Sequence, residues 1–401
     1  IREAQIIFAQ REDKKEIQVV NLAIGNVSLP MHPAMQNRLN EMGEIRFKDG
    51  VVKYTPSVGT DEGREAFLNI IGSEGVNTSH LYCMITDGGS QAMELMMLGV
   101  CGPSSEKPLM LLEPAYTNYI EFGKRLSIPI VTANREISDD GTFEPLALDD
   151  IEKIITENAP GGLLVIPTDN PTGQFLNQRQ LINLAKICVN HNIWIISDEA
   201  YRQLYYGEDG SSSIWKISEE DVPGITGSRI SIESSSKVWN ACGLRIGGLV
   251  TDNLEFHTKA VSEYTANLCA NAIGQEIFGS LAHESHHDLN AWYQRQRDYY
   301  SGLIMPLREN LMKEIPGLIV SNPEAAIYFV LDFRSICADT FDSRDFVKYC
   351  ASKGKVRIDD QEFTLLLAPM NGFYSDPKKG KTQMRVAMVA PKKLIEKTPL
   401  I

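Results

Sequence analysis

Residues 234–247 read SSSKVWNACGLRIG and place a single lysine, Lys237, directly behind a run of serines. Arg245 follows eight residues after the lysine, in a segment punctuated by glycines. A lysine that bonds covalently to an aldehyde cofactor needs such neighbours, because hydroxyls and a guanidinium can hold the cofactor's phosphate while the amine reaches its carbonyl. The stretch therefore indicates a phosphate-bearing aldehyde cofactor, although an ordinary surface loop would also explain a serine-rich segment.

The bulk composition argues against a nucleic-acid or membrane partner. The 401 residues can build a large core, and two domains are the expected number. The net charge of −13 disfavours nucleic acid, and no apolar run is long enough to span a bilayer. The seven cysteines are scattered without a CxxC pair, which is typical of reduced thiols and predicts a cytoplasmic location. The first residues resemble the middle of a helix, and no signal peptide is visible.

Short apolar runs alternate with amphipathic stretches from about residue 85 to residue 250. The helical periodicity is clearest over Gln178–Asn190. The predicted strands are Leu109–Glu113, Pro129–Ala133, Leu163–Pro167, Ile193–Asp198, Arg229–Ser234 and Gly247–Thr251. Strands that alternate with helices predict an α/β domain with a mainly parallel sheet, which binds ligands at the carboxyl ends of its strands.

The alternation of short apolar runs and amphipathic stretches ends after about residue 270. A long helix is predicted through Trp292 and Tyr300, followed by strands near Ile327–Asp332 and Met384–Val389. We therefore expect a large domain over residues 41–270. Residues 1–40 and 271–401 would form a smaller α+β domain from both chain ends.

Two polar segments follow predicted strands of the large domain. Residues 169–173, DNPTG, form a turn that exposes the Asn170 amide, although ordinary turns share this composition. Asp198 ends another apolar strand, where a carboxylate is costly to bury without a cation such as a protonated pyridine nitrogen. Tyr201 lies one helical turn onward and could bond the ring oxygen of the same ligand. A helix N-cap is the simpler explanation for Asp198.

Two further segments suit the same ligand. Residues 86–92, TDGGSQA, open a helix, and glycines at a helix N-terminus let free N–H groups approach an anion such as phosphate. Tyr116 follows the strand Leu109–Glu113 and could stack on an aromatic ring, or simply be a core tyrosine. Near the C-terminus, Arg385 opens an apolar strand, and its fork of N–H groups matches the two oxygens of a carboxylate.

In their order and spacing these segments resemble the class I/II aminotransferases, in the fold-type-I pyridoxal-phosphate-dependent (aspartate aminotransferase-like) superfamily, over nearly the whole chain. The resemblance implies a seven-stranded sheet sandwiched by helices, pyridoxal 5'-phosphate as cofactor, and a homodimer with shared active sites. Residues 53–59, KYTPSVG, match the element whose tyrosine, here Tyr54, reaches the phosphate of the partner subunit. The other implied cofactor contacts are Gly89, Ser90, Gln91, Tyr116, Asn170, Asp198, Tyr201, Ser234, Ser236, Lys237 and Arg245.

The resemblance also implies substrate contacts and a reaction. Gly25, Asn170 and Arg385 would bind the substrate, with Arg385 on its α-carboxylate. Lys237 would move the α-proton, helped by Asp198 and Tyr201, in a ping-pong transfer of an amino group from an L-amino acid to a 2-oxo acid. A carbon–sulfur β-lyase uses the same first step and stays the nearest alternative. A condensing synthase and a catalytically silent amino-acid sensor are more distant.

The substrate side chain is left open. No second arginine for a side-chain carboxylate stands out in the sequence, so specificity for aspartate does not follow, and aromatic or neutral amino acids remain open.

A competing motif reads HESHH at residues 283–287 and matches the H-E-x-x-H pattern of zinc proteases. On one helix, His283 and His287 could bind zinc with Glu284 as general base. A catalytic site also needs a third ligand, for which Glu309 and Glu314 are only loose candidates, and so short a pattern arises often by chance. We therefore expect no metal site.

Overall fold

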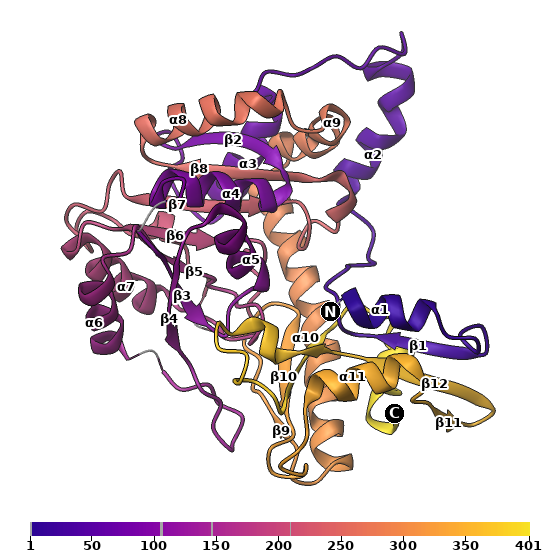
Figure 1. Cartoon of the computed structure of the whole chain (residues 1–401). Coiled ribbons are helices and arrows are strands. Elements are labelled where there is room, and N and C mark those ends of the chain that lie inside the picture. Colours follow the sequence, from indigo (N-terminus) through magenta and orange to yellow (C-terminus); the bar gives the residue numbers. More distant parts are fainter. Residues whose placement is uncertain (1, 105–106, 146, 209) are drawn as a thin grey trace.

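The computed structural model describes residues 2–104, 107–145, 147–208 and 210–401. A seven-stranded sheet of order β2-β8-β7-β6-β5-β3-β4 forms the centre of the larger part of the molecule (Figure 1). Its strands are β2 (Tyr82–Asp87), β3 (Leu109–Glu113), β4 (Ile130–Asn134), β5 (Gly162–Val165), β6 (Trp194–Asp198), β7 (Arg229–Ser234) and β8 (Ile246–Thr251). Strand β8 runs antiparallel to β2 and β7 on either side of it, and the other neighbouring strands pair in parallel, so the prediction of a mainly parallel α/β sheet is confirmed.

All of the predicted large-domain strands are present, with small differences at their ends. The prediction Leu163–Pro167 runs too far, because the pairing of β5 with β6 ends at Val165, before Pro167, which has no N–H for a ladder. The predicted strand at 129–133 is shifted by one residue. The prediction also missed β2, whose run Tyr82–Asp87 ends in the polar residues that lead into the glycine turn.

Helices cover both faces of this sheet. Neighbouring strand residues such as Ile195 and Ile196 are buried in two different apolar clusters, as the alternation of a β-strand requires. The helices of the larger part are α3 (Asp61–Gly72), α4 (Gly88–Cys101), α5 (Thr117–Leu126), α6 (Leu148–Asn158), α7 (Gln178–Asn190), α8 (Leu254–Tyr264) and α9 (Ala272–Gly279). The predicted helix Gln178–Asn190 is confirmed as α7.

The smaller part contains two sheets that join the two ends of the chain. β1 (Ile17–Asn21) pairs in parallel with β12 (Gln361–Leu366), which also pairs with β11 (Val356–Ile358). The other sheet contains β9 (Ile319–Val320), β10 (Tyr328–Asp332), β13 (Ala368–Pro369) and β14 (Gln383–Ala387). This confirms a separate small α+β part, while the exact residue limits of the two domains stay a prediction.

The remaining helices include the long helix predicted through Trp292 and Tyr300. This helix, α10, spans His286–Glu314, and its apolar face is buried. Figure 1 shows the N-terminal helix beside α11 of the small part. The other helices here are α1 (Arg2–Ala9), α2 (Pro33–Glu41), α11 (Ser343–Ser352) and α12 (Lys392–Ile395). Among the residues that the structure describes, no helix is both long and apolar enough to cross a membrane.

The histidine motif does not form a helical zinc site. His283 ends a 3₁₀ turn, and Ser285 caps α10, which begins only at His286. The Nε2 atom of His283 lies 2.6 Å from a carboxylate oxygen of Glu62. Within the described ranges, no group of three histidine, cysteine, aspartate or glutamate side chains could hold a metal ion.

Candidate active site

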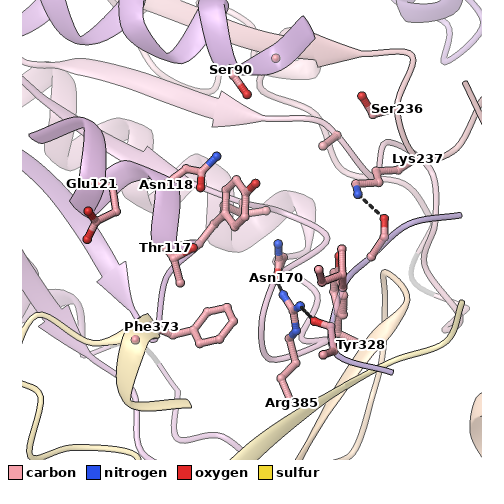
Figure 2. Close-up of a pocket in the computed structure, with 18 of the residues that line it drawn as sticks. Ser90, Thr117, Asn118, Glu121, Asn170, Ser236, Lys237, Tyr328, Phe373 and Arg385 are labelled. Atoms are coloured by element: carbon pink, nitrogen blue, oxygen red, sulfur yellow. Dashed lines mark hydrogen bonds between the residues drawn. The ribbon is translucent and has the colours of Figure 1, made fainter. Parts of the chain in front are cut away.

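A cavity of about 790 Å³ lies at the carboxyl end of the large sheet, against elements of the small part (Figure 2). It gathers residues that are far apart in the sequence, as expected where parallel strands end together. The predicted site residues that line it are Gly25, Gly89, Ser90, Tyr116, Asn170, Asp198, Tyr201, Ser234, Ser236, Lys237, Arg245 and Arg385. Gln91 and Tyr54 are the predicted residues outside this lining.

Asp198 is the buried carboxylate of the cavity. It ends β6, and its side chain accepts hydrogen bonds from the Tyr119 hydroxyl at 2.7 Å and the Ala200 N–H at 3.1 Å. Burial raises the pKa of Asp198 to about 6, although the bond from Tyr119 pulls in the opposite direction. No cation of the described chain forms an ion pair with it. A protonated pyridine nitrogen would supply the missing charge, so this position fits pyridoxal phosphate.

The turn between β2 and α4 has the shape of a phosphate cradle. Gly88 adopts a φ of +72°, and a Cβ at this position would collide with the guanidinium of Arg245. A Cβ at Gly247 of β8 would collide with the backbone of Gly88, so two glycines let the strand and the turn touch. An arginine and a helix N-terminus therefore converge at Gly89 and Ser90, which suits a phosphate dianion.

The amine of Lys237 points into the cavity and donates a hydrogen bond to the carbonyl oxygen of Gly25 (Figure 2). Gly25 has no room for a side chain, because a Cβ there would collide with the Tyr328 hydroxyl and lie 3.2 Å from the lysine nitrogen. The lysine comes from the loop after β7, whereas Gly25 follows β1. The reactive amine is therefore held where the large and small parts meet.

Arg385 is held rigidly from several sides. It is 3% exposed, and its two terminal nitrogens donate to Asn170 Oδ1 and to the Ala23 carbonyl, both at 2.7 Å. Its guanidinium carbon lies 4.2 Å from the ring centre of Tyr328 and 4.9 Å from that of Phe373. The buried Nε atom has no hydrogen-bond partner among the described residues. This fork is positioned to receive a carboxylate that enters the cavity.

The sequence did not point to three side chains that shape the site. Tyr328, on β10, places its hydroxyl 2.5 Å from the hydroxyl of Tyr201. Tyr119 bonds Asp198, and Phe373 covers the guanidinium of Arg385. Tyr119 could have been found, because it lies one helical turn after Tyr116. Tyr328 carries no such signal, since an apolar strand containing a tyrosine usually belongs to the core.

Tyr54 and Gln91 lie apart from the cavity lining in the single chain. Tyr54 precedes α3 and is 79% exposed, an unusual exposure for a tyrosine. Gln91 is half-buried in the first turn of α4. In the single chain, Tyr54 therefore does not contact the phosphate cradle at Gly89.

The chain was compared with known proteins. The family model described as aminotransferase class I and II matches residues 17–393. An aspartate aminotransferase of Sulfolobus acidocaldarius is 27% identical over 370 residues, covering 90% of this chain and 86% of that protein. A probable aspartate/prephenate aminotransferase of Aquifex aeolicus is 25% identical over 316 residues, covering 78% of this chain and 76% of that protein.

Solved structures share the fold. N-succinyldiaminopimelate aminotransferase from Mycobacterium tuberculosis superposes with a TM-score of 0.82 at 20% identity, covering 100% of this chain and 95% of that one. A pyridoxal-phosphate-bound putative aminotransferase from Clostridium difficile gives a TM-score of 0.77 at 17% identity, covering 94% and 90% of the two chains. At these sequence identities, the comparison with solved structures shows a shared fold and nothing more.

Proposed function

This chain belongs to the aminotransferase class I and II family, and we propose that the residues around Lys237 give it the chemistry of an amino-group transfer from an L-amino acid to a 2-oxo acid. The observation that carries the proposal is that the amine of Lys237, the carboxylate of Asp198 and the guanidinium of Arg385 line one cavity. These are the three charged groups that a pyridoxal-phosphate enzyme needs for its carbonyl, its ring nitrogen and its substrate.

Pyridoxal phosphate, when bound, supplies an electrophilic carbonyl and an electron-withdrawing ring. Arg245 and the N-terminus of α4 would hold its phosphate at Gly89 and Ser90, with Gln91 in the same helical turn. Ser234 and Ser236 would add hydroxyls. Tyr116 would contact the ring, Asp198 would pair with its nitrogen, and Asn170 and Tyr201 would bond its oxygen. These roles use the donor or acceptor that each side chain presents to the cavity.

Arg385 orients the substrate by binding the α-carboxylate, assisted by Asn170 and the backbone at Gly25. Asn170 gives its amide oxygen to Arg385, which leaves the amide N–H groups for a ligand. Lys237 takes the proton from the substrate's α-carbon and returns a proton when the oxo acid is converted, a general acid–base role that depends on its position. Amino donor and oxo acid use one site in turn, which gives ping-pong kinetics.

Transamination is favoured over the two alternatives. A carbon–sulfur β-lyase and an amino-acid sensor would use the same cofactor contacts, so the cavity alone does not separate them. The relatives of this chain are named as aminotransferases, and they match it over most of their length. Turnover that requires a 2-oxo acid separates the enzyme from both alternatives.

The active form is proposed to be a cytoplasmic homodimer. Tyr54 is exposed in a loop that also exposes Val51 and Val52, and Ser57 of this loop bonds the carbonyl of exposed Leu268. A second copy of the chain would cover this apolar surface and bring Tyr54 to its partner's phosphate cradle. The seven free cysteines support a reducing compartment.

The test is an absorbance spectrum of the purified holoenzyme before and after L-amino acids are added without an oxo acid. Conversion of the lysine-bound band to that of the amine form of the cofactor is the expected result, followed by recovery of the band when a 2-oxo acid is added. Release of pyruvate and ammonia with an unchanged band would indicate a lyase. Absence of any band after incubation with pyridoxal phosphate would overturn the proposal.

A further inference from the structure

Two tyrosine hydroxyls meet inside the cavity, and they come from different parts of the molecule. Tyr201 follows β6 of the large sheet, whereas Tyr328 opens β10 of the small part. Their hydroxyl oxygens lie 2.5 Å apart, and their rings meet edge to face at 77°. Both side chains line the cavity and are buried. The proposed function uses Tyr201 alone, so the hydroxyl of Tyr328 is an unassigned group at the reacting site.

The backbone around the two tyrosines holds this contact in place. The N–H of Ala326 donates to the carbonyl oxygen of Leu204 at 2.8 Å, which bonds the segment before β10 to the segment after Tyr201. The Tyr206 hydroxyl donates to the carbonyl oxygen of Ala326. Ala326 also adopts a φ of +57°, a conformation that a non-glycine residue keeps only where its neighbours hold it. The position of Tyr328 against Tyr201 is therefore fixed by the fold.

The direction of the hydrogen bond between the tyrosines follows from what Tyr201 has to do. A tyrosine hydroxyl has one hydrogen to donate, and its oxygen can accept a second bond. When Tyr201 donates to the ring oxygen of the cofactor, its hydrogen is used, so the contact persists only if Tyr328 is the donor. Hydrogen bonds in such a chain polarise one another. The bond from Tyr328 therefore strengthens the bond that Tyr201 gives.

The ring of Tyr328 contacts the substrate side of the cavity. The guanidinium carbon of Arg385 lies 4.2 Å from the centre of this ring, and Figure 2 shows the two side chains next to each other. The hydroxyl of Tyr328 lies beside Gly25, near the amine of Lys237. The titratable or charged side chains that face the pair of tyrosines are Tyr116, Lys237, Tyr300 and Arg385.

We propose that Tyr328 is a positioning residue with two separable roles. Its hydroxyl donates to Tyr201 and so strengthens the hydrogen bond from Tyr201 to the ring oxygen of the cofactor, while its ring holds Arg385 for the substrate. The inference rests on the proposed function, since Tyr201 must bond the ring oxygen. A stronger bond stabilises the more negative, deprotonated form of the lysine-bound cofactor, and therefore lowers the pH at which that form appears.

The experiment is a pH titration of the lysine-bound absorbance band of the holoenzyme, which needs no turnover. Tyr328→Phe keeps the ring and removes the hydroxyl, and should raise the midpoint by about 0.3–0.5 pH unit. Tyr201→Phe removes the direct donor and should raise the midpoint by about one pH unit. The double variant should match Tyr201→Phe, because the hydroxyl of Tyr328 acts only through Tyr201.

Tyr328→Leu tests the second role, because it removes the ring as well as the hydroxyl. It should raise KM by about fivefold for the amino donor that the parent enzyme uses best, whereas Tyr328→Phe should change this KM by less than about twofold. The matched control is Tyr293→Phe. It removes a buried hydroxyl outside the cavity lining that has no hydrogen-bond partner among the residues that the structure describes. Both the midpoint and KM should keep their parent values in this control.

The inference is overturned if Tyr328→Phe has the midpoint of the parent enzyme or a lower one. A shift larger than that of Tyr201→Phe would place Tyr328 itself at the ring oxygen, and shifts that add in the double variant would make the two hydroxyls independent, so either result also overturns it. Equal KM values in Tyr328→Leu and Tyr328→Phe would remove the role of the ring. If the parent holoenzyme has no lysine-bound band, the proposed function itself has failed, and this result is distinct from an unchanged midpoint.

Discussion

The hydroxyl of Tyr119 donates a 2.7 Å hydrogen bond to Oδ2 of Asp198, and both side chains are buried. The bond favours the ionised carboxylate, which burial otherwise disfavours. Tyr119→Phe should therefore raise the pKa of Asp198, so that the acid limb of the pH profile of kcat/KM moves upward by about one pH unit. Tyr349→Phe, an exposed control on α11, should leave the profile in place. An unchanged acid limb in Tyr119→Phe would show that this bond does not control ionisation.

Removing the Asp198 charge should stabilise the fold of the apoprotein but weaken the binding of pyridoxal phosphate. The pKa of Asp198 in the folded protein, about 6, lies above the ordinary value of 3.8. The folded state thus holds the proton more tightly, and the stability of the apoprotein falls as pH rises between these values. Asp198→Asn should therefore stabilise the apoprotein more at pH 8 than at pH 4, as measured by Tm. The same variant should bind pyridoxal phosphate more weakly. If the difference in Tm between Asp198→Asn and the parent apoprotein does not depend on pH, the raised pKa of Asp198 is contradicted.

Replacing Lys237 by alanine should abolish turnover and the lysine-bound absorbance band while the fold is kept. The side chain is half-buried and bonds one carbonyl, so its loss removes little packing. Loss of both the covalent link and the proton-transferring amine predicts a decrease in kcat of about 10⁴-fold or more. Lys186→Ala, an exposed change on α7, is the control. Substantial activity of Lys237→Ala in single-turnover assays would remove this lysine from the mechanism.

The residues at strand ends were predictable because their placement depends on local signals. Turn residues after an apolar run fix where a parallel strand ends, so Asn170 and Asp198 could be placed at one sheet edge from the sequence. Helix α7 was predicted with its observed limits from its apolar face, and the structure adds a capping box at Asn177 that fixes where the helix begins. The glycine turn at Gly88 was recognised, but its contact with Arg245 required the antiparallel pairing of β2 with β8.

The substrate side of the site was much less predictable. Arg344, which also lines the cavity, lies on the amphipathic helix α11, and the sequence gives no sign that this arginine faces a cavity. Its position depends on the packing of α11 against α1, β12 and β13, which only the three-dimensional structure reveals. Tyr328 likewise reaches Tyr201 because β10 crosses from the small part. Contacts between elements distant in sequence leave no local pattern.

If Tyr54 completes the partner's site, two inactive variants should restore activity when mixed. A dimer of one Tyr54→Ala chain and one Lys237→Ala chain contains one site with neither change. Random exchange of subunits would then give about a quarter of the parent activity, because half of the dimers are mixed and each has one intact site. The measurement is turnover after unfolding and refolding the mixture together. Activity that never exceeds the sum of the separate variants would place Tyr54 outside the partner's site.

A buried cluster of carboxylates that includes Glu199, the residue after Asp198, should depend mainly on Arg202 for its stability. Arg202 lies 2.6 Å from carboxylate oxygens of both Glu74 and Glu233 and 3.7 Å from Glu199, and all four side chains are buried. Burial raises the pKa of Glu199 to about 8, and Arg202 is the main influence in the opposite direction. Arg202→Met would leave Glu199 and Glu233 without a cation and Glu74 with only Lys216, at 3.9 Å. Breaking such a buried pair costs about 3–5 kcal/mol.

The stability that Arg202→Met loses should increase as the pH rises. Because the folded pKa of Glu199 lies above its ordinary value of 4.5, stability from this group falls as pH rises from about 4.5 to about 8. Without Arg202 the carboxylates hold their protons more tightly, so the decline becomes steeper. The Tm of Arg202→Met should therefore fall further below that of the parent apoprotein at pH 8 than at pH 6. Arg179→Met, an exposed control on α7, should show no such trend. A Tm deficit equal at both pH values would mean that lost packing, rather than the unpaired charges, destabilises the variant.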